Sequence, residues 1–315
     1  MNNPFYRVLI IIIISCALSQ LVFVQLDSGL LKFNCFTNEK LTEMLVKPTE
    51  YKLITLGSSR SLSHVNPAVL DSVLKIKTYN AGIAGANIYE IKTVFNAYLN
   101  VRKTAPEFVV LNIDRRTLSN LQKFYNNTIY YPYLNNVVID STLKEIGIKT
   151  YLYRYMPFVQ LFEYDDYMRN IGIQGHKNKN EINVENTYYH GFMSLAKTKV
   201  FHLKSDDKLE FDNLVTNEGI NHLVEILNTC TQKGIKLIFV FAPELHAGNY
   251  PINKSLFTID SIAKIHHLDI LRFDNLDSIY TAKNFADKRH LNGLGADRFS
   301  LHLAQSLAPI IKLAK

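Results

Sequence analysis

The chain has 315 residues, of which 47% are hydrophobic and 20% are charged, and this composition is that of an ordinary globular protein. The formal net charge is +7, but lysines and arginines are dispersed among acidic residues, which disfavours nucleic-acid binding and is compatible with a place near anionic lipid or an acidic polymer. The 3 cysteines form no Cys-x-x-Cys pair and no His/Cys cluster, so we expect no metal site.

An uncharged apolar run, Val8 to Leu26, lies near the start of the chain. At about 1.5 Å per helical residue, it can just cross a hydrocarbon core of about 30 Å. We therefore expect a membrane anchor in residues 1–28, followed by a linker in residues 29–50. Arg7 is the only basic residue ahead of the run, which favours a cytoplasmic N-terminus and places the rest of the chain outside.

The domain would also be exported under two alternative interpretations of this apolar run. Ala17-Leu18-Ser19 could be the cleavage site of a signal peptide, and Ile13 to Cys16 loosely fits a bacterial lipidation box. We favour retention of the helix, because Leu21 to Val24 continue the apolar run and a mature chain beginning there would expose them.

From residue 51 onwards, apolar runs alternate with segments of helical periodicity, which is typical of an α/β domain with a parallel sheet. We expect Pro309 to kink or end the last helix. The five expected strands are Leu53 to Leu56, a short one from Thr78, Phe108 to Ile113, Lys236 to Phe241 and Leu268 to Phe273. The expected helices are Pro67 to Leu74, Ile88 to Leu99, Ile220 to Cys230, Leu256 to Lys264 and one from about Gly295.

The alternation is interrupted between residues 118 and 216, where tyrosines are dense. About a hundred residues are too many for a structureless loop in a compact domain, so we expect a helical or mixed insert that resembles a lid. Its tyrosines could bind the faces of sugars or an acyl group, but for most of them we favour the alternative that they pack the insert.

Two motifs carry the residues of nucleophilic catalysis. Gly57-Ser58-Ser59-Arg60 follows a buried strand, and Asp287-Lys288-Arg289-His290 lies near the end of the chain. An acid and an imidazole three residues apart can be presented by one turn of chain, with His290 accepting the serine proton and Asp287 orienting the ring.

These motifs, together with Asn80 to Gly85, resemble blocks I, II and V of the SGNH/GDSL hydrolases. More closely, the chain resembles the exported, membrane-anchored, serine-arginine branch, whose relatives occur in O-acyl transfer systems of the bacterial envelope. The resemblance covers roughly residues 51–310 without the insert. It implies a three-layer, flavodoxin-like α/β/α fold at the outer side of a bacterial cell membrane.

The resemblance also implies roles for individual residues. Ser59 matches the nucleophile, and its backbone N–H would be one oxyanion donor. Ser58 stands where the family usually has aspartate and is the alternative nucleophile. Gly85 matches the glycine whose N–H is a second donor, and Asp287 and His290 match block V.

Block III is the departure from the family pattern. The expected Gly-x-Asn-Asp is replaced by Asp114-Arg115-Arg116, so the third oxyanion donor is left open between Arg116, Asn112 and Arg60. Each motif also has a structural alternative, in which Ser58 and Ser59 cap a helix and Asp287 caps the last one.

Other residues are expected near the substrate. Arg60, His64 and Glu244 are candidates for lining it, and His246 could border it because it follows the end of a strand. Cys35 and Cys230 are either a disulfide or two free thiols.

The pattern as a whole predicts a serine-dependent acyl-ester hydrolase, or an O-acyl (acetyl) transferase acting on envelope glycan, that needs no cofactor. A membrane-bound acyltransferase is the expected partner. The alternative is a catalytically degenerate envelope protein that binds glycan or a partner. A nucleotide-binding protein is disfavoured, because Gly82 to Ala86 lacks the full Gly-x-Gly-x-x-Gly and no Walker lysine follows a glycine loop.

Overall fold

The computed structural model describes residues 4–32, 36–119, 123–177, 188–195, 215–244, 254–273 and 281–313. The chain forms two compact units. The first consists of residues 1–47 and 126–182, and the second of residues 48–125 and 183–315. The second unit therefore contains every expected strand, and residues 126–182 of the expected insert belong to the first.

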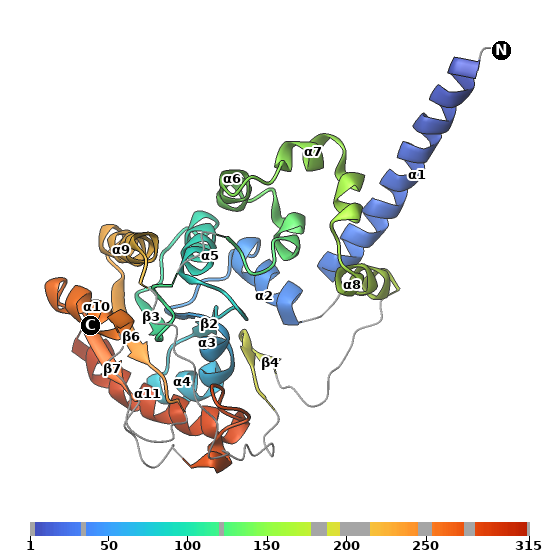
Figure 1. Cartoon of the computed structure of the whole chain (residues 1–315). Helices are drawn as coiled ribbons and strands as arrows, with labels where there is room; N and C mark the ends of the chain where they lie inside the picture. The colour runs from blue at the N-terminus through green and yellow to red at the C-terminus, as the bar shows by residue number, and fades with distance from the viewer. Residues whose placement is uncertain are drawn as a thin grey trace, which may run out of the picture. The chain divides into compact units, whose positions relative to one another are not determined.

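The second unit is built on a parallel sheet of five strands in the order β2-β1-β3-β6-β7 (Figure 1). In β1, Leu53 lies opposite Thr78 of β2 on one side and Phe108 of β3 on the other. All residues of β1 and β3 are buried, as is typical of parallel strands covered on both faces. The strands are β1 (Leu53–Leu56), β2 (Thr78–Asn80), β3 (Phe108–Ile113), β6 (Lys236–Phe241) and β7 (Asp269–Arg272).

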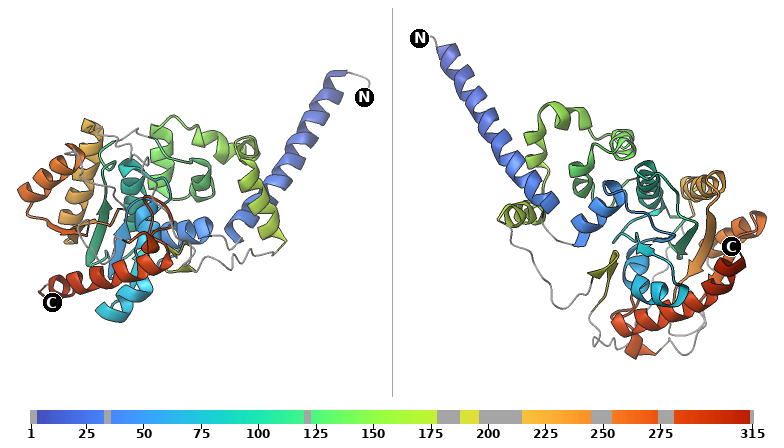
Figure 2. Two further views of the ribbon diagram at one scale, coloured as in Figure 1. Left: turned by 60° about the horizontal axis from the view of Figure 1, so that its bottom comes forward. Right: turned by 180° about the vertical axis from the view of Figure 1, so that it is seen from behind.

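Helices cover both faces of this sheet, which confirms the predicted three-layer α/β/α architecture (Figures 1 and 2). One face carries α3 (Ser59–His64), α4 (Pro67–Leu74) and α11 (Gly293–Leu313), and α11 contacts both α3 and α4. On the opposite face lie the helices α5 (Ile88–Asn100) and α9 (Asn217–Gln232), and α10 (Lys254–Ile265) contacts β7.

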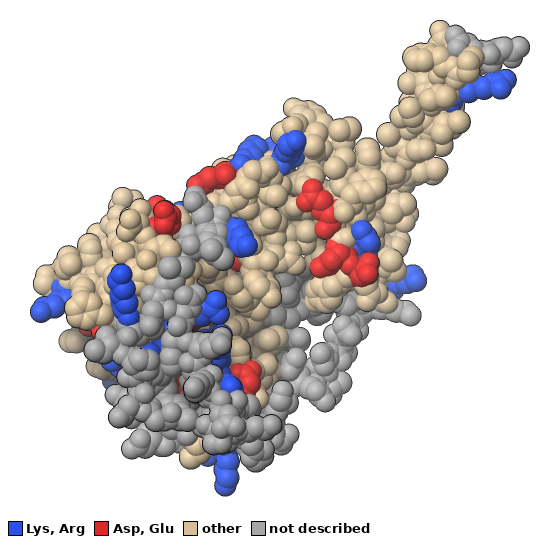
Figure 3. Space-filling model, in the orientation of Figure 1, with Lys and Arg blue, Asp and Glu red and all other residues tan. Residues whose placement is uncertain are grey.

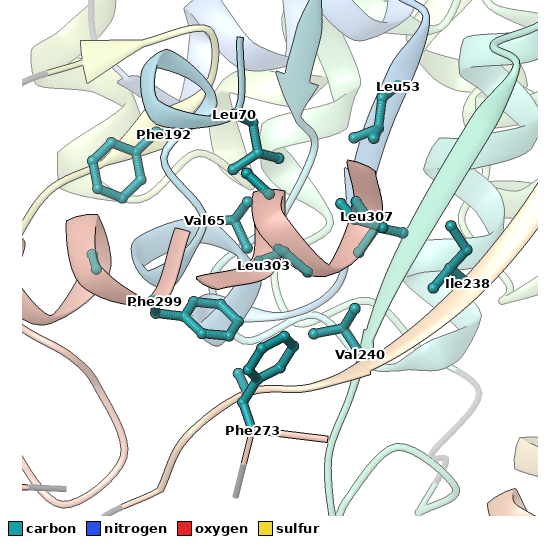
Figure 4. Packing of buried hydrophobic residues seen from close by; sticks show 14 of the residues in the cluster. Leu53, Val65, Leu70, Phe192, Ile238, Val240, Phe273, Phe299, Leu303 and Leu307 are labelled. Atoms are coloured by element: carbon teal, nitrogen blue, oxygen red, sulfur yellow. The ribbon is translucent and has the colours of Figure 1, made fainter. Parts of the chain in front are cut away.

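The main hydrophobic core fills the space between the sheet and α4 and α11 (Figure 4). Phe299, Leu303 and Leu307 of α11 are fully buried there, at the spacing of one helical face. Phe299 packs edge to face on Phe273, with ring centroids 5.2 Å apart. Burial of such a side chain contributes roughly 1.5–3 kcal/mol, so α11 is fixed firmly on the sheet and its start is a stable place for site residues.

The last helix differs from the expectation at both ends. It begins at Gly293 rather than near Gly295, and it runs past Pro309 to Leu313. Proline lacks the N–H that would donate to a carbonyl one turn earlier in the helix. Pro309 lies close to the end of α11, where the loss of this one hydrogen bond does not stop the helix from continuing to Leu313.

A short antiparallel hairpin, β4 (Tyr188–Tyr189) and β5 (Phe192–Met193), covers the edge of β2. His190 and Gly191 form its turn with φ values of 43° and 79°, and the backbone N–H of Asn80 donates to the His190 carbonyl over 2.8 Å. The hairpin leaves no signal in the sequence, because strands of two residues are too short to show an alternation of apolar and polar residues.

The first unit is helical in its described part. Its long helix α1 packs on α8, where Gly29 and Gly172 bring the two backbones into contact. Other helices complete it: α1 (Pro4–Lys32), α2 (Phe36–Leu45), η1 (Thr128–Tyr133), α6 (Val137–Glu145), α7 (Thr150–Tyr155), η2 (Pro157–Phe162) and α8 (Asp166–His176).

By length and composition, α1 could cross a membrane. Its most apolar stretch has a mean hydropathy of 2.5, and only 6% of that stretch is buried. Figure 3 shows it as an uncharged surface with basic atoms near the free end. A core helix of a soluble protein would be mostly buried, so this exposure favours a membrane anchor or a signal sequence, with or without lipidation.

Five tyrosines of the first unit are buried: Tyr130, Tyr131, Tyr133, Tyr153 and Tyr164. The Tyr131 ring lies 4.9 Å from that of Tyr153, and both hydroxyls donate to the carboxylate of Glu163. Tyr155, by contrast, is 85% exposed. In the second unit, Cys230 is a buried free thiol, and Cys35 lies outside the described residues.

Candidate active site

A sharp turn after β1 presents Ser59 at the carboxyl edge of the sheet, where ligands of open α/β sheets bind. Gly57 makes this turn with φ of 149°, and a Cβ there would lie 2.8 Å from that of Ser61 and 3.1 Å from that of Asn112. Only glycine fits. Ser58 is the N-cap residue of α3, but its side chain makes no capping hydrogen bond, and Ser59 is the first residue of the helix.

The structure brings Ser59, His290 and Asp287 together, although 231 residues separate the first two. The Ser59 Oγ lies 2.8 Å from His290 Nε2, and His290 Nδ1 lies 2.9 Å from Asp287 Oδ2. This relay of nucleophile, base and orienting acid has the geometry of a serine–histidine–aspartate catalytic triad.

Asp287 is held in place by its own loop rather than by the last helix. Its Oδ1 accepts the backbone N–H groups of Arg289 and His290 over 2.8 and 2.9 Å. Burial raises the pKa of Asp287, but the hydrogen bond and charge of His290 and these N–H groups outweigh it and hold the pKa below its ordinary value. The acid is therefore a carboxylate near neutral pH, able to stabilise an imidazolium.

The expected oxyanion donors lie in the lining of the same pocket as Ser59. The backbone N–H groups of Ser59 and Gly85 donate to no group among the described residues, which leaves them available to a ligand. Gly85 has φ of 74°, and a Cβ there would lie 2.7 Å from the Tyr125 ring, so a glycine is required at this position.

Asn112, one of the three alternatives for the third donor, ends up in an unusual environment. It is 6% exposed, it lines the pocket, and neither atom of its side-chain amide has a hydrogen-bond partner among the described residues. A buried polar group without a partner costs about 1–3 kcal/mol, so it needs an explanation, and a role in binding a ligand is one. Arg116 also lines the pocket but is exposed.

Arg60 and Glu244 line the pocket as expected, but they also form a buried ion pair. Arg60 further donates to the carbonyls of Ala242 and Pro243 over 2.6 and 3.1 Å, which ties α3 to the end of β6. Glu244 accepts a second bond, from Arg115 Nε over 3.1 Å. Arg60 thus has structural partners and is no free oxyanion donor.

His64 does not line the pocket, contrary to the expectation. It is fully buried, and its Nε2 accepts the backbone N–H of Leu291 over 3.0 Å. Burial lowers the pKa of His64 well below its usual range, and the charges of Arg60 and His290 lower it further. His64 is thus a neutral support for the loop that carries His290, because α3 turns its last residue inward.

The pocket has a volume of about 420 Å³ and an aromatic wall that no local motif predicts. Phe124 and Tyr125 form this wall, and the Tyr125 N–H donates to Glu90 in α5 over 3.0 Å. Their place in the tyrosine-dense segment was the only available signal. His246 lies outside the described residues. Within the described part of the chain, no cluster of His, Cys, Asp and Glu could hold a metal ion.

No family model matches the chain, and no curated protein matches it. Among the solved structures that are similar to it are three bacterial proteins. A G-D-S-L family lipolytic protein from Desulfitobacterium hafniense has 11% identity and a TM-score of 0.40, covering 81% of this chain and 99% of its own. An acylhydrolase from Bacteroides fragilis has 13% identity and a TM-score of 0.42, and the match covers 88% of this chain and 95% of the acylhydrolase. A GDSL-like lipase from Bacteroides thetaiotaomicron has 12% identity and a TM-score of 0.39, covering 88% and 100%.

Proposed function

We propose that the chain is a serine-dependent acyl-ester hydrolase or O-acyltransferase. The observation that carries the proposal is the relay itself, with Ser59 Oγ 2.8 Å from His290 Nε2 and His290 Nδ1 2.9 Å from the Asp287 carboxylate. The pocket beside it is accessible and holds backbone N–H groups without partners among the described residues. Such an arrangement activates a hydroxyl and stabilises the negative charge that follows its attack.

In this mechanism, His290 Nε2 takes the proton of Ser59 as Oγ attacks the carbonyl carbon of an ester. The tetrahedral oxyanion accepts hydrogen bonds from the N–H groups of Ser59 and Gly85. When the intermediate collapses, His290 returns the proton to the leaving alcohol, and an acyl-enzyme remains on Ser59. Water or a sugar hydroxyl, deprotonated by His290, then takes the acyl group.

Asn112 is our choice for the third oxyanion donor. Its amide is buried and without a partner among the described residues, so it is not needed for any other contact in the fold. Its Cβ lies beside Gly57, in the turn that positions Ser59. Arg116 is exposed and would lose more side-chain entropy to reach a fixed oxyanion position.

Envelope glycan is the acceptor or ester that we favour, on the outer face of a bacterial membrane. The exposed apolar helix α1 supports a membrane location, and the exposed Tyr125 ring in the pocket lining is suited to the face of a sugar. A membrane-bound acyltransferase could supply the acyl group.

A hydrolase and a transferase would use the same residues of this site. To distinguish the two activities, the full chain is incubated with an activated acetyl ester and glycan oligomers. A transferase places the acetyl group on the sugar, whereas a hydrolase releases it as free acetate.

A fluorophosphonate reaction tests the nucleophile directly. The full chain in detergent should be labelled, Ser59→Ala should not be, and Ser58→Ala should retain labelling. Loss of labelling only in Ser58→Ala would shift the nucleophile by one residue. A parent chain that is folded yet unlabelled would make the non-catalytic glycan-binding alternative the better explanation.

A further inference from the structure

The pocket beside Ser59 is enriched in cations. Of its 21 lining residues, six are lysine or arginine, whereas the whole chain of 315 residues has 35. Acidic residues are not enriched, since two line the pocket and 28 occur in the chain. Lysine and arginine are thus more than twice as frequent in the pocket lining as in the whole chain. The six cations are Arg60, Arg115, Arg116, Lys123, Lys288 and Arg289.

The floor of the pocket holds two buried arginines and one buried glutamate. Arg60 and Arg115 are both buried and share the single carboxylate of Glu244. Arg60 Nε has no hydrogen-bond partner among the described residues. The other lining carboxylate, Asp114, accepts the backbone N–H of Arg116 within its own turn. A buried guanidinium acts over a longer range than an exposed one, because less water screens it.

The rim of the pocket, defined here as Arg116, Lys123 and Arg289, adds three exposed cations from separate segments of the chain. Arg116 follows β3, Lys123 precedes the aromatic wall and Arg289 lies between Asp287 and His290. Among the residues that the structure describes, no carboxylate lies within ion-pair distance of these three side chains. Like charges around one cavity repel one another, and an anionic ligand would remove that cost.

From this distribution, we infer that the site acts on acyl esters that carry a carboxylate or phosphate close to the scissile bond. The inference rests on the proposed function and narrows its substrate class. A neutral sugar ester would leave the rim without a counterion, whereas an anionic ester would be steered into the pocket and held there. A solvated rim that binds nothing is the alternative.

A matched series of phenyl acetates isolates the effect of charge. We would measure kcat/KM of the full chain in detergent for 4-acetoxybenzamide, 4-acetoxybenzoate and 4-acetoxyphenyl phosphate, which are neutral, carboxylate and phosphate esters of similar size. Both anionic esters should be preferred over the amide by about tenfold or more, and the preference should shrink as salt rises from about 20 mM to about 500 mM. A larger preference for one anion identifies the group.

Single charge removals then locate the preference. Arg116→Gln and Arg289→Gln should each lower the ratio of anionic to neutral kcat/KM by roughly three- to tenfold. Lys264→Gln is the matched control, because Lys264 is exposed on α10 and does not line the pocket, so the ratio should stay at the parent value. Thermal unfolding of each variant checks that it is folded.

Binding without turnover separates this inference from the proposed function. Ligand-observed NMR on Ser59→Ala measures the affinity for the same three esters whether or not the parent hydrolyses them. Equal turnover and equal binding of all three would overturn the inference and leave an esterase. A parent that hydrolyses none of them, while Ser59→Ala still binds the anionic esters preferentially, would overturn the proposed function and keep the anion site.

Discussion

Ser59 depends on small neighbours for its position. Gly57 adopts a φ of 149°, and its missing Cβ leaves room for Ser61 and for Asn112. The same turn therefore places the nucleophile and the side chain that we propose as an oxyanion donor. A Cβ on Gly57 would lie 2.8 Å from that of Ser61, which is sterically forbidden. The turn that positions Ser59 therefore requires glycine at position 57.

Gly57→Ala should therefore abolish activity through misplacement of Ser59. We expect labelling by the fluorophosphonate to fall by about 10² or more, since small displacements of a nucleophile cost rate steeply. Gly234→Ala is the control, because Gly234 also has a positive φ but nothing lies within 4 Å of its Cβ position. That variant should lose about 1 kcal/mol of stability and keep its labelling. Equal labelling of both variants would contradict the steric argument.

Asn112→Ala should separate catalysis from stability. Loss of an oxyanion donor lowers kcat by about 10²–10³ with little change in KM. Loss of a buried amide that has no partner among the described residues should leave the melting temperature unchanged or raise it, because its desolvation is not compensated in the fold. Steady-state kinetics and thermal unfolding measure both effects. An unchanged kcat would remove Asn112 from the oxyanion site.

The helix α3 supports the catalytic loop as well as the nucleophile. Its first residue is Ser59, and its last, His64, accepts the Leu291 N–H just before α11 begins. The carbonyl of His64 also accepts from Ser300 of α11 over 3.1 Å. One short helix thus fixes the distance between Ser59 and His290 from both sides.

The burial of His64 gives a pH dependence with a definite sign. Its folded pKa lies below the unfolded value, so the unfolded chain binds a proton first as pH falls. Stability is then complete above about pH 6.5 and declines as pH falls toward the depressed folded pKa. Melting temperatures between about pH 7 and pH 5 should fall more steeply in the parent than in His64→Gln, which can still accept the Leu291 N–H. Parallel profiles would show that His64 does not titrate on unfolding.

The strands and most helices could be predicted because buried parallel strands are continuous apolar runs. All six residues of β3 are buried, and the helix Pro67–Leu74 has the predicted bounds. The residues of the relay could also be predicted, since each of them lies in a motif with fixed local spacing. Residues that come into contact only in the folded chain could not be paired from the sequence. Glu244 lies 184 residues from Arg60, and no local pattern indicates that the two form an ion pair.

The residues that line the pocket and the apolar helix α1 belong to different units. Every residue that lines the pocket belongs to residues 48–125 or 183–315, while α1 belongs to the first unit. A change in α1 should therefore alter where the protein resides without altering the relay. This separation allows the anchor and the cleaved signal to be distinguished while activity serves as an internal control.

Replacing both Ile14 and Leu18 by lysine tests the anchor. Both side chains are exposed near the middle of the apolar run in α1, and a lysine near the centre of a spanning helix costs about 2.5–3.5 kcal/mol. We expect the parent to stay with membranes after alkaline extraction and the double variant to be released, whereas an Ile14→Leu, Leu18→Ile control should stay. Fluorophosphonate labelling in detergent should be equal in all three. A parent that is released, with an N-terminus beyond Ser19, would show that the helix is a signal sequence, because cleavage there removes the part of α1 that the lysines occupy.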